Sequence, residues 1–436
     1  MITVVFIFNF IKIIFNNYSI IILFIVQFLF YGCESATYEN NKYSNQKLKA
    51  NNEIIINSEK NFIKEIKIGL LLPLSGSNSN IGNSLLKASQ LSLNKTKNKN
   101  IQLIIKDTEN INKNIITSYY ELINEDVDII LGPLFTKNIE LINSISLDED
   151  TIMITFSNNT EIKNKNTFIS GLTPEDEIKE VFKYAIESGK KKFGVILPNN
   201  QYGLRSKRLI ESLLAEDQVQ LTEVILYDSK NPDFYEAAKV IANYEIRKYE
   251  LEKKLEELKN LNSEESKRKY KLLKNKDTLG SLNFDSIFIG AENIKHLSML
   301  ASILPYYDVD PKEVLYIGNS LWSNNIALKE PALEKGLFPN VNQANYENFK
   351  LEYINAFKKN PHKISSLAYD LIGLISTLQK NNQNIDVLSV TNENGFMGSN
   401  GLFRFKRDGN IERSLSIFQI KNQKIKEVQK ANSDFN

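Results

Sequence analysis

This 436-residue chain has two histidines and one cysteine, and its abundant carboxylates do not fall in a metal-ligand pattern. Ser75 stands in the sequence LSGS, which lacks the G-x-S-x-G turn of a nucleophilic serine. The histidines His296 and His362 have neither a triad context nor the helical spacing of metal ligands. Gly69 and Gly82 do not form a dinucleotide-binding fingerprint. We therefore expect no catalytic residue, no metal and no cofactor, and we interpret the chain as a binder rather than an enzyme.

Cys33 is the only cysteine, which excludes an intramolecular disulfide and a cysteine-rich metal cluster. The uncharged apolar run Ile20–Phe30 ends just before it and is shorter than the roughly 20 residues of a membrane-spanning helix. The pattern predicts a signal peptide over residues 1–32, with an uncleaved membrane helix as the alternative. Gly32 followed by Cys33 resembles a bacterial lipobox, which implies lipidation of Cys33. Residues 33–64, rich in polar side chains, then form a tether.

The composition describes a globular protein. Hydrophobic residues make up 42% of the chain and charged residues 24%, which is neither a disordered nor a multi-span membrane composition. A formal net charge of +2 gives no strong attraction to nucleic acid, so no nucleic-acid partner is expected. The length exceeds what one compact core usually holds and suits two α/β lobes.

From residue 65 onward, short apolar runs alternate with segments whose apolar residues have helical spacing. Such alternation predicts a parallel, doubly wound sheet with right-handed crossovers. The alternation restarts after Gly171–Pro174, so we expect an α/β fold of two doubly wound parallel-sheet lobes. The expected division is 65–172 for the first part of lobe 1, 173–318 for lobe 2, 319–394 for the second part of lobe 1, and 395–428 for a terminal hairpin of lobe 2 that turns at Asp408-Gly409.

One segment of lobe 2, residues 244–277, does not fit the alternation. It is highly charged, and four leucines form one helical stripe: Leu251, Leu255, Leu258 and Leu261. Asn262 followed by Glu265 predicts the cap of a second helix. We expect an antiparallel helical hairpin inserted into lobe 2. Its charges are either a solvated face or a surface that docks a partner.

Several motifs carry a family resemblance across residues 66–428. The run Ile68–Gly76, followed by Gly82, resembles the first strand and loop of type I periplasmic binding proteins of the leucine-binding group. Asp107-Thr108, Ile129–Leu134 and Asn199–Gly203 follow in the same order. Leu304–Pro311, Asn319–Trp322 and Gly401–Phe405 resemble the related domain of penicillin-binding protein activators, including single-domain lipoproteins. The best-known activators also have amino-terminal helical repeats, which we do not expect in this chain.

The resemblance also suggests a ligand cleft, since ligands in such folds meet the carboxyl ends of the strands. By that resemblance Thr136, Ser157 and Asn159 would grip a ligand carboxylate, and Ser75 at the end of the first strand would also line the ligand site. Tyr202 would close over the ligand from the second lobe, and Glu292 would face an ammonium group, as for a small amino-acid-like ligand. The alternative is that these serines and asparagines only cap turns and helices.

The expected function is binding in the cell envelope. By resemblance, the partner would be a peptidoglycan synthase, a penicillin-binding protein, and the protein would sit in the periplasm, lipid-anchored to the outer membrane. The alternative is the substrate-binding component of an amino-acid ABC transporter, which would serve an ABC permease by hinge closure around Gly171–Thr173 and Gly318-Asn319. A third possibility is a purely structural envelope lipoprotein.

Overall fold

A computed structural model describes residues 65–435 of the chain, apart from 110–111, 146–150, 217–218 and 262. Within these residues, no helix combines the length and the apolar composition needed to cross a bilayer. The expected signal peptide (1–32), the tether (33–64) and Cys33 lie outside the described residues.

The first lobe is built on a five-stranded sheet in the order β2-β1-β3-β4-β5, with every pairing parallel. Alternate residues of β1 serve two different cores, because helices cover both faces. Leu70 and Leu72 pack with residues of α2 and α13, whereas Leu71 packs with residues of α3 and α4. This arrangement explains the continuous run Ile68–Leu72 of β1, which has no polar side chain, as is typical of buried parallel strands. The elements are β1 (Ile66–Leu72), α2 (Ser79–Thr96), β2 (Ile101–Asp107), α3 (Asn112–Asn124), β3 (Ile129–Leu131), α4 (Thr136–Ile145), β4 (Ile152–Thr155), β5 (Thr167–Ile169), α12 (Gln343–Phe357), α13 (Ser365–Lys380) and α14 (Val387–Val390).

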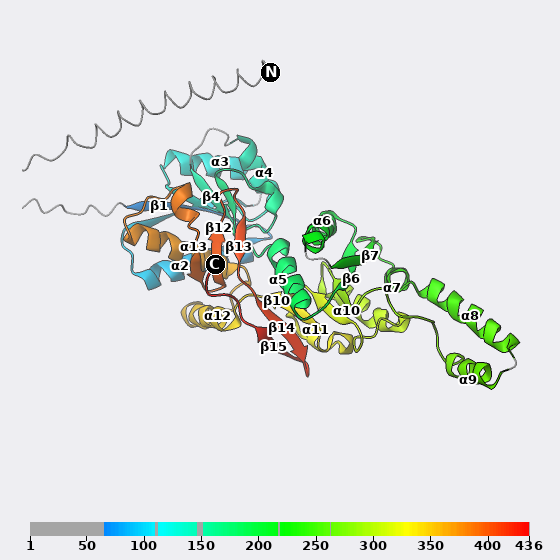
Figure 1. The fold of residues 1–436 in the computed structure, drawn as a ribbon. Coiled ribbons are helices and arrows are strands. Elements are labelled where there is room, and N and C mark those ends of the chain that lie inside the picture. Colours follow the sequence, from blue (N-terminus) through cyan, green and yellow to red (C-terminus); the bar gives the residue numbers. More distant parts are fainter. Residues whose placement is uncertain (1–64, 110–111, 146–150, 217–218, 262, 436) are drawn as a thin grey trace, which may run out of the picture. The chain divides into compact units, whose positions relative to one another are not determined.

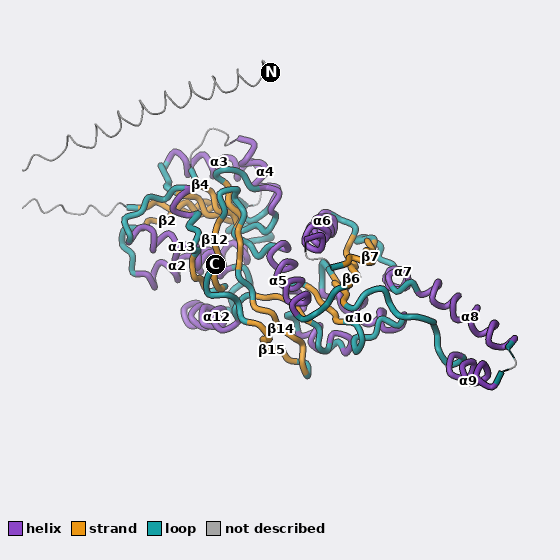
Figure 2. Tube along the Cα trace, in the orientation of Figure 1, coloured by secondary structure: helices purple, strands orange, loops and turns teal. Residues whose placement is uncertain are grey.

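The second lobe is built on a seven-stranded sheet in the order β15-β14-β10-β9-β8-β6-β7. Its strands from β10 to β7 pair in parallel, and β14 and β15 join one edge antiparallel. Helices flank this sheet as well (Figures 1 and 2). The elements are α5 (Pro174–Glu187), β6 (Lys192–Pro198), α6 (Gln201–Glu216), β7 (Gln220–Tyr227), α7 (Phe234–Ile241), β8 (Ser286–Ile289), α10 (Ile294–Ile303), β9 (Leu315–Gly318), α11 (Asn325–Leu328), β10 (Leu337–Asn340), β14 (Ser416–Lys421) and β15 (Lys424–Gln429).

The second lobe extends further along the sequence than we expected. The expected boundary at 318/319 is wrong, because β10 pairs with β9 and β14 in the second sheet. The chain therefore returns to the first lobe after Asn340, and Gly318-Asn319 is not a crossing. β10 has only four residues, including Pro339, and so gives a weak strand pattern.

The expected terminal hairpin is also corrected. β12 (Gly401–Phe405) does turn at Asp408-Gly409, but it pairs with β13 (Ile411–Arg413) and with β11 (Phe396–Gly398) in a separate three-stranded sheet. Phe403 and Phe405 of β12 are buried in the core of the first lobe. The second-lobe share of this segment consists of β14 and β15 alone. The chain thus passes between the lobes three times: after β5, after β10 and after β13.

The charged insertion forms two contacting helices, α8 (Tyr244–Asn260) and α9 (Glu264–Leu273), which extend beyond the second sheet in Figure 1. We call them the arm. Leu251 and Leu258 of the expected leucine stripe are buried, whereas Leu261 is 57% exposed. The cap of α9 is Ser263, whose side chain accepts from the Ser266 amide, and not Asn262, which lies outside the described residues.

Candidate binding cleft

The first-lobe side of the cleft begins with the loop after β1, and Asp107 at the end of β2 holds this loop. The Asp107 carboxylate accepts hydrogen bonds from the amides of Leu74 (2.8 Å), Ser75 (3.3 Å) and Glu109 (2.9 Å). Burial alone would raise the pKa of Asp107, but hydrogen bonds from Ser75 and the backbone outweigh it and hold the pKa below its usual value. Ser75 is therefore part of a braced loop. Thr136 lies half-buried as the first residue of α4.

Ser157 and Asn159 share one turn after β4. The Asn159 amide donates to Ser157 Oγ (3.1 Å), and Asn159 caps the short 3-10 helix η1 (Thr160–Ile162) by accepting from the Glu161 amide (3.2 Å). Both side chains thus satisfy the local backbone, as the capping alternative predicted. Asn159 makes one further contact that the sequence did not reveal.

That contact joins the two lobes. Arg205 of α6 donates from Nη1 to Asn159 Oδ1 at 2.6 Å. Thr160 donates to Glu175 Oε1 of α5 at 2.9 Å, and Arg208 lies 3.5 Å from Glu161. Because these bonds link η1 to two second-lobe helices, we call them the lobe bridge. The bridge occupies a side chain that we had assigned to a ligand carboxylate.

The second-lobe side is a buried polar cluster around Tyr202, the second residue of α6. Asn319 donates from Nδ2 to the Tyr202 hydroxyl (3.1 Å) and to the Ala291 carbonyl (3.2 Å). Burial raises the pKa of Tyr202, so its hydroxyl stays protonated at neutral pH. Tyr202 is therefore fixed by the loops after β8 and β9.

Glu177 of α5 is the acid buried in this cluster. Its carboxylate accepts from the Ser320 amide (3.2 Å) and from the Ser320 hydroxyl. Burial raises the pKa of Glu177 to about 7. Glu292, the acid expected to face an ammonium group, is instead exposed and accepts a hydrogen bond from Asn200.

The structure thus places Tyr202 in the first turn of α6 and Glu292 in the loop after β8, which Asn200 links by a hydrogen bond, and it places Ser157 and Asn159 in one turn of the first lobe. Sequence reasoning missed Arg205, Glu177 and Asn319. No short motif connects these residues, because their neighbours come from elements far apart in the chain. Glu177 in particular stands in the acidic first turn of a helix, a position that normally only complements the helix dipole.

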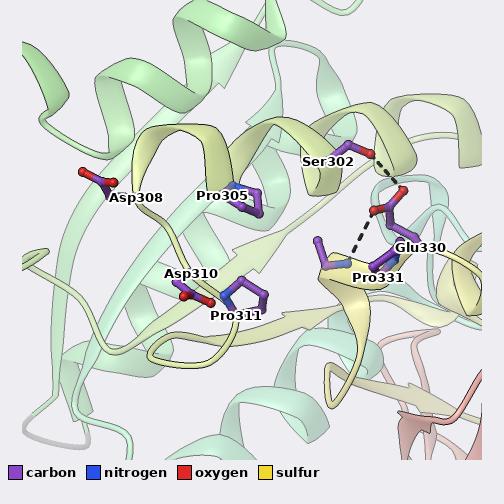
Figure 3. A pocket seen from close by; sticks show the side chains of 8 residues that line it. Ser302, Pro305, Asp308, Asp310, Pro311, Glu330 and Pro331 are labelled. Atoms are coloured by element: carbon purple, nitrogen blue, oxygen red, sulfur yellow. Dashed lines mark hydrogen bonds between the residues drawn. The ribbon is translucent and has the colours of Figure 1, made fainter. Parts of the chain in front are cut away.

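Two cavities lie away from these strand ends. The first is an open groove of about 500 Å³ in the second lobe, shown in Figure 3. Its acids serve the surrounding fold: Glu330 accepts from the Ser302 hydroxyl (2.8 Å) and caps a 3-10 turn, and Asp308 pairs with Arg247 (3.4 Å). The second is a cavity of about 620 Å³ in the first lobe, between α12, α13 and β11.

The comparisons with known proteins agree with this architecture. Residues 65–245 match the periplasmic binding protein family. The leucine binding protein LivK of Thermotoga maritima MSB8 has a TM-score of 0.54 at 14% identity, over 84% of this chain and 99% of that one. A solute binding protein of an ABC transporter from Rhodopseudomonas palustris BisB5, in complex with 3,4-dihydroxybenzoic acid, has a TM-score of 0.55 at 16% identity, over 85% and 97%.

The carboxy-terminal domain of LpoA from Haemophilus influenzae, a regulator of PBP1A, has a TM-score of 0.56 at 16% identity, over 83% of this chain and 99% of that one. An uncharacterised protein of Rickettsia prowazekii is 25% identical over 187 residues, which are 43% of this chain and 50% of that protein. The chain thus aligns with half the length of this relative. The structural likenesses establish the fold of type I periplasmic binding proteins.

Proposed function

We propose that this chain, whose residues 65–245 carry a periplasmic-binding-protein domain, acts by docking to a membrane-bound penicillin-binding protein that synthesises peptidoglycan. It would do so without catalysis, as a regulator. One protein of the same fold, the LpoA domain, is a regulator of PBP1A. The family also favours a periplasmic location, and lipidation of Cys33 would tether the body to the envelope.

The arm is the observation that carries this proposal. It is fixed to the second lobe at its base, where Arg247 donates to the Gly280 carbonyl (3.3 Å) and to Asp308 (3.4 Å). Beyond the base it presents apolar side chains to solvent: Tyr249 is 62% exposed, Leu261 57% and Leu272 69%. Exposed aromatic and aliphatic side chains among charges are typical of protein-docking surfaces. A ligand-capturing protein needs its lobes and hinge but has no use for such a projection.

The base of the arm also permits a sharp experiment. The Leu279 amide donates to the Arg247 carbonyl at 3.0 Å, so the chain leaves and re-enters the lobe at one place. Replacing residues 249–276 by a short Gly-Ser linker should leave both lobes folded, since the ends already meet. We expect this variant to lose a crosslinked penicillin-binding protein in cells while keeping a cooperative unfolding transition.

A charge-reversed arm provides the finer test: Lys253→Glu, Glu257→Lys and Lys267→Glu together. All three residues are exposed, and the leucines that join the two helices are untouched. The matched control reverses Glu347 and Lys350 on α12, an exposed ion pair of the same type (3.1 Å). Capture at wild-type yield by both arm variants would overturn docking through the arm.

The alternative function is that of a substrate-binding component of an ABC transporter, favoured by the likeness to LivK. A transport receptor gains stability from its ligand by mass action, about 2.7 kcal/mol at a hundredfold excess over the Kd. A thermal-shift screen of amino acids and hydroxybenzoates should therefore produce a clear shift that Tyr202→Ala abolishes. If the screen shifts nothing, the transporter alternative fails, whereas loss of partner capture on arm deletion supports docking independently.

A further inference from the structure

The first-lobe cavity has features that neither the fold nor the proposed docking function uses. It has a volume of about 620 Å³, which lies within the usual range of small-molecule sites. Its walls include the rings of Phe349, Tyr369, Phe396 and Phe403. The Phe349 and Tyr369 ring centroids are 5.1 Å apart, and those of Phe396 and Phe403 are 6.0 Å apart. The cavity is thus lined by two pairs of packed aromatic rings.

A buried carboxylate and a buried hydroxyl also line this cavity. Asp370 is 6% exposed and accepts from the amides of Ser399 (2.6 Å) and Asn400 (3.2 Å). Ser399 is 9% exposed, and its hydroxyl lies within reach of the same carboxylate, which it can serve as a donor. The lone pairs of this hydroxyl accept no hydrogen bond from a described group, so they are available to a donor on a ligand.

The cations around the cavity already have acidic partners. At its mouth Lys95 and Glu352 neutralise each other at 2.6 Å. Deeper in the lobe Arg413 acts on Asp370 and also on the buried Asp176. The guanidinium of Arg413 bonds to the Ser170 carbonyl (2.7 Å). Two buried acids therefore share one guanidinium, and a bound ammonium group would give Asp370 a cation of its own.

We propose that the first-lobe cavity binds a small organic ammonium compound, whose nitrogen lies beside Asp370 and Ser399 and whose apolar body lies between the aromatic rings. Aromatic faces attract cations, and a desolvated carboxylate attracts them more strongly. Ser399 accepts one ammonium proton with the lone pairs that no protein group occupies. Burial raises the pKa of Asp370, and a bound ammonium group favours its ionised form.

The test uses the full chain and three probes of similar size: 2-phenylethylammonium, 2-phenylethanol and 3-phenylpropionate. We expect the ammonium probe to bind about tenfold more tightly than the alcohol, and the carboxylate not to bind, in calorimetric or ligand-observed NMR titrations. Ser399→Ala, which is small and spares the carboxylate, should weaken binding of the ammonium probe several-fold.

A variant that closes the cavity tests whether the probe binds inside it. Asn348 is exposed at the cavity mouth on α12, and Asn348→Trp should close the cavity and abolish binding. Leu351→Trp puts the same bulk on the same helix, at a residue that is 57% exposed and does not line the cavity, and it should leave the affinity unchanged. Equal affinity for all three probes, no binding of any, or unchanged binding by a folded Asn348→Trp variant would each overturn the proposal.

Discussion

Two opposing effects act on the pKa of Glu177: the helix dipole favours the ionised form and burial disfavours it. As a member of the first turn of α5, it lies where the helix dipole favours negative charge. As a buried residue, it pays for ionisation by losing water, although Ser320 donates two hydrogen bonds to it. Burial prevails and raises its pKa from 4.5 to about 7. The folded protein therefore holds a proton that the unfolded chain releases.

This difference predicts a pH-dependent stability. Between about pH 4.5 and 7 the folded state binds more protons at Glu177 than the unfolded state, so the free energy of unfolding falls as pH rises through this window. Glu177→Gln removes that titration while keeping an acceptor for Ser320. The free energy of unfolding of the wild type, measured with urea, should be higher at pH 5 than at pH 8. In the variant we expect this difference to be smaller by up to about 3 kcal/mol.

The matched control is Glu187→Gln, an exposed glutamate at the other end of the same helix, which should retain the wild-type slope. Asp176 has a pKa that burial also raises to about 7, so part of the slope persists in Glu177→Gln. An unchanged slope in Glu177→Gln would contradict the assignment of the buried proton to this side chain.

The lobe bridge permits a second prediction, by a double-mutant cycle. Arg205→Ala and Asn159→Ala should each lower the free energy of unfolding by about 1 kcal/mol, and the pair should show a coupling of about 1 kcal/mol, because the bond is partly buried. Arg208 and Glu161 span the same two elements, but their side chains are 67% and 48% exposed, so their cycle should give almost no coupling. Equal couplings in the two cycles would contradict this account.

For single residues, the sequence predicted that the candidate site residues follow strands, but it did not predict which side chains they contact. Ser157, Asn159 and Tyr202 do follow strands, because a strand end is readable from the apolar run before it. Their partners Arg205 and Asn319 are not readable, since the contacts join segments separated by 46 and 117 residues. Only the folded chain reveals that Asn159 meets an arginine.

At the scale of elements, the last residue of β9, Gly318, packs directly on the ring of Trp322. A Cβ on Gly318 would lie 2.1 Å from Trp322 Nε1, and Trp322 is fully buried. Gly318→Ala should therefore destabilise the second lobe by about 2 to 3 kcal/mol through overpacking, measured by urea unfolding at pH 7. Gly373→Ala should instead stabilise by about 0.5 to 1 kcal/mol, because the glycine is inside α13 and its Cβ would meet only Ser92 Oγ at 3.8 Å. Similar effects of the two changes would contradict this packing.

The elements that the sequence predicted well are those with long periodic patterns. Ile66–Leu72 is a short apolar run and forms a strand, and the helical spacing of Ile81–Leu93 and Leu367–Leu378 predicts helices that lie within α2 and α13. Strands β5, β10 and β13 have three or four residues each, too few to show a period. Their strand conformation comes from neighbours in the sheets, which a local pattern does not contain.

For the whole molecule, the predicted attachment to the cell envelope depends on Cys33, which lies outside the described residues. If Cys33 is lipidated, Cys33→Ser should release the protein from membranes or leave it as a precursor. Membrane fractionation, gel mobility and labelling with an acyl probe measure this outcome. Equal membrane retention, with unchanged mobility and no acyl label on the parent protein, would refute the lipid anchor and favour an uncleaved helix.

The three crossings explain why the lobes cannot be separated by one cut in the sequence. The first crossing requires glycine, because a Cβ on Gly171 would lie 2.6 Å from the Ser157 carbonyl oxygen. The Gly171 amide donates to that same carbonyl at 2.9 Å. Arg413, at the third crossing, donates to the Ser170 carbonyl at the first. Two crossings that are 243 residues apart in sequence are therefore bonded to each other.

This interleaving also sets the order in which the molecule can be completed during synthesis. The ribosome delivers all five strands of the first sheet before residue 170, yet one face of that sheet is covered by α13 and by Phe403 and Phe405. The nascent first lobe therefore keeps an uncovered apolar face until almost the whole polypeptide has been made. We therefore expect the first lobe to reach its final stability only after residues 365–405 have been made.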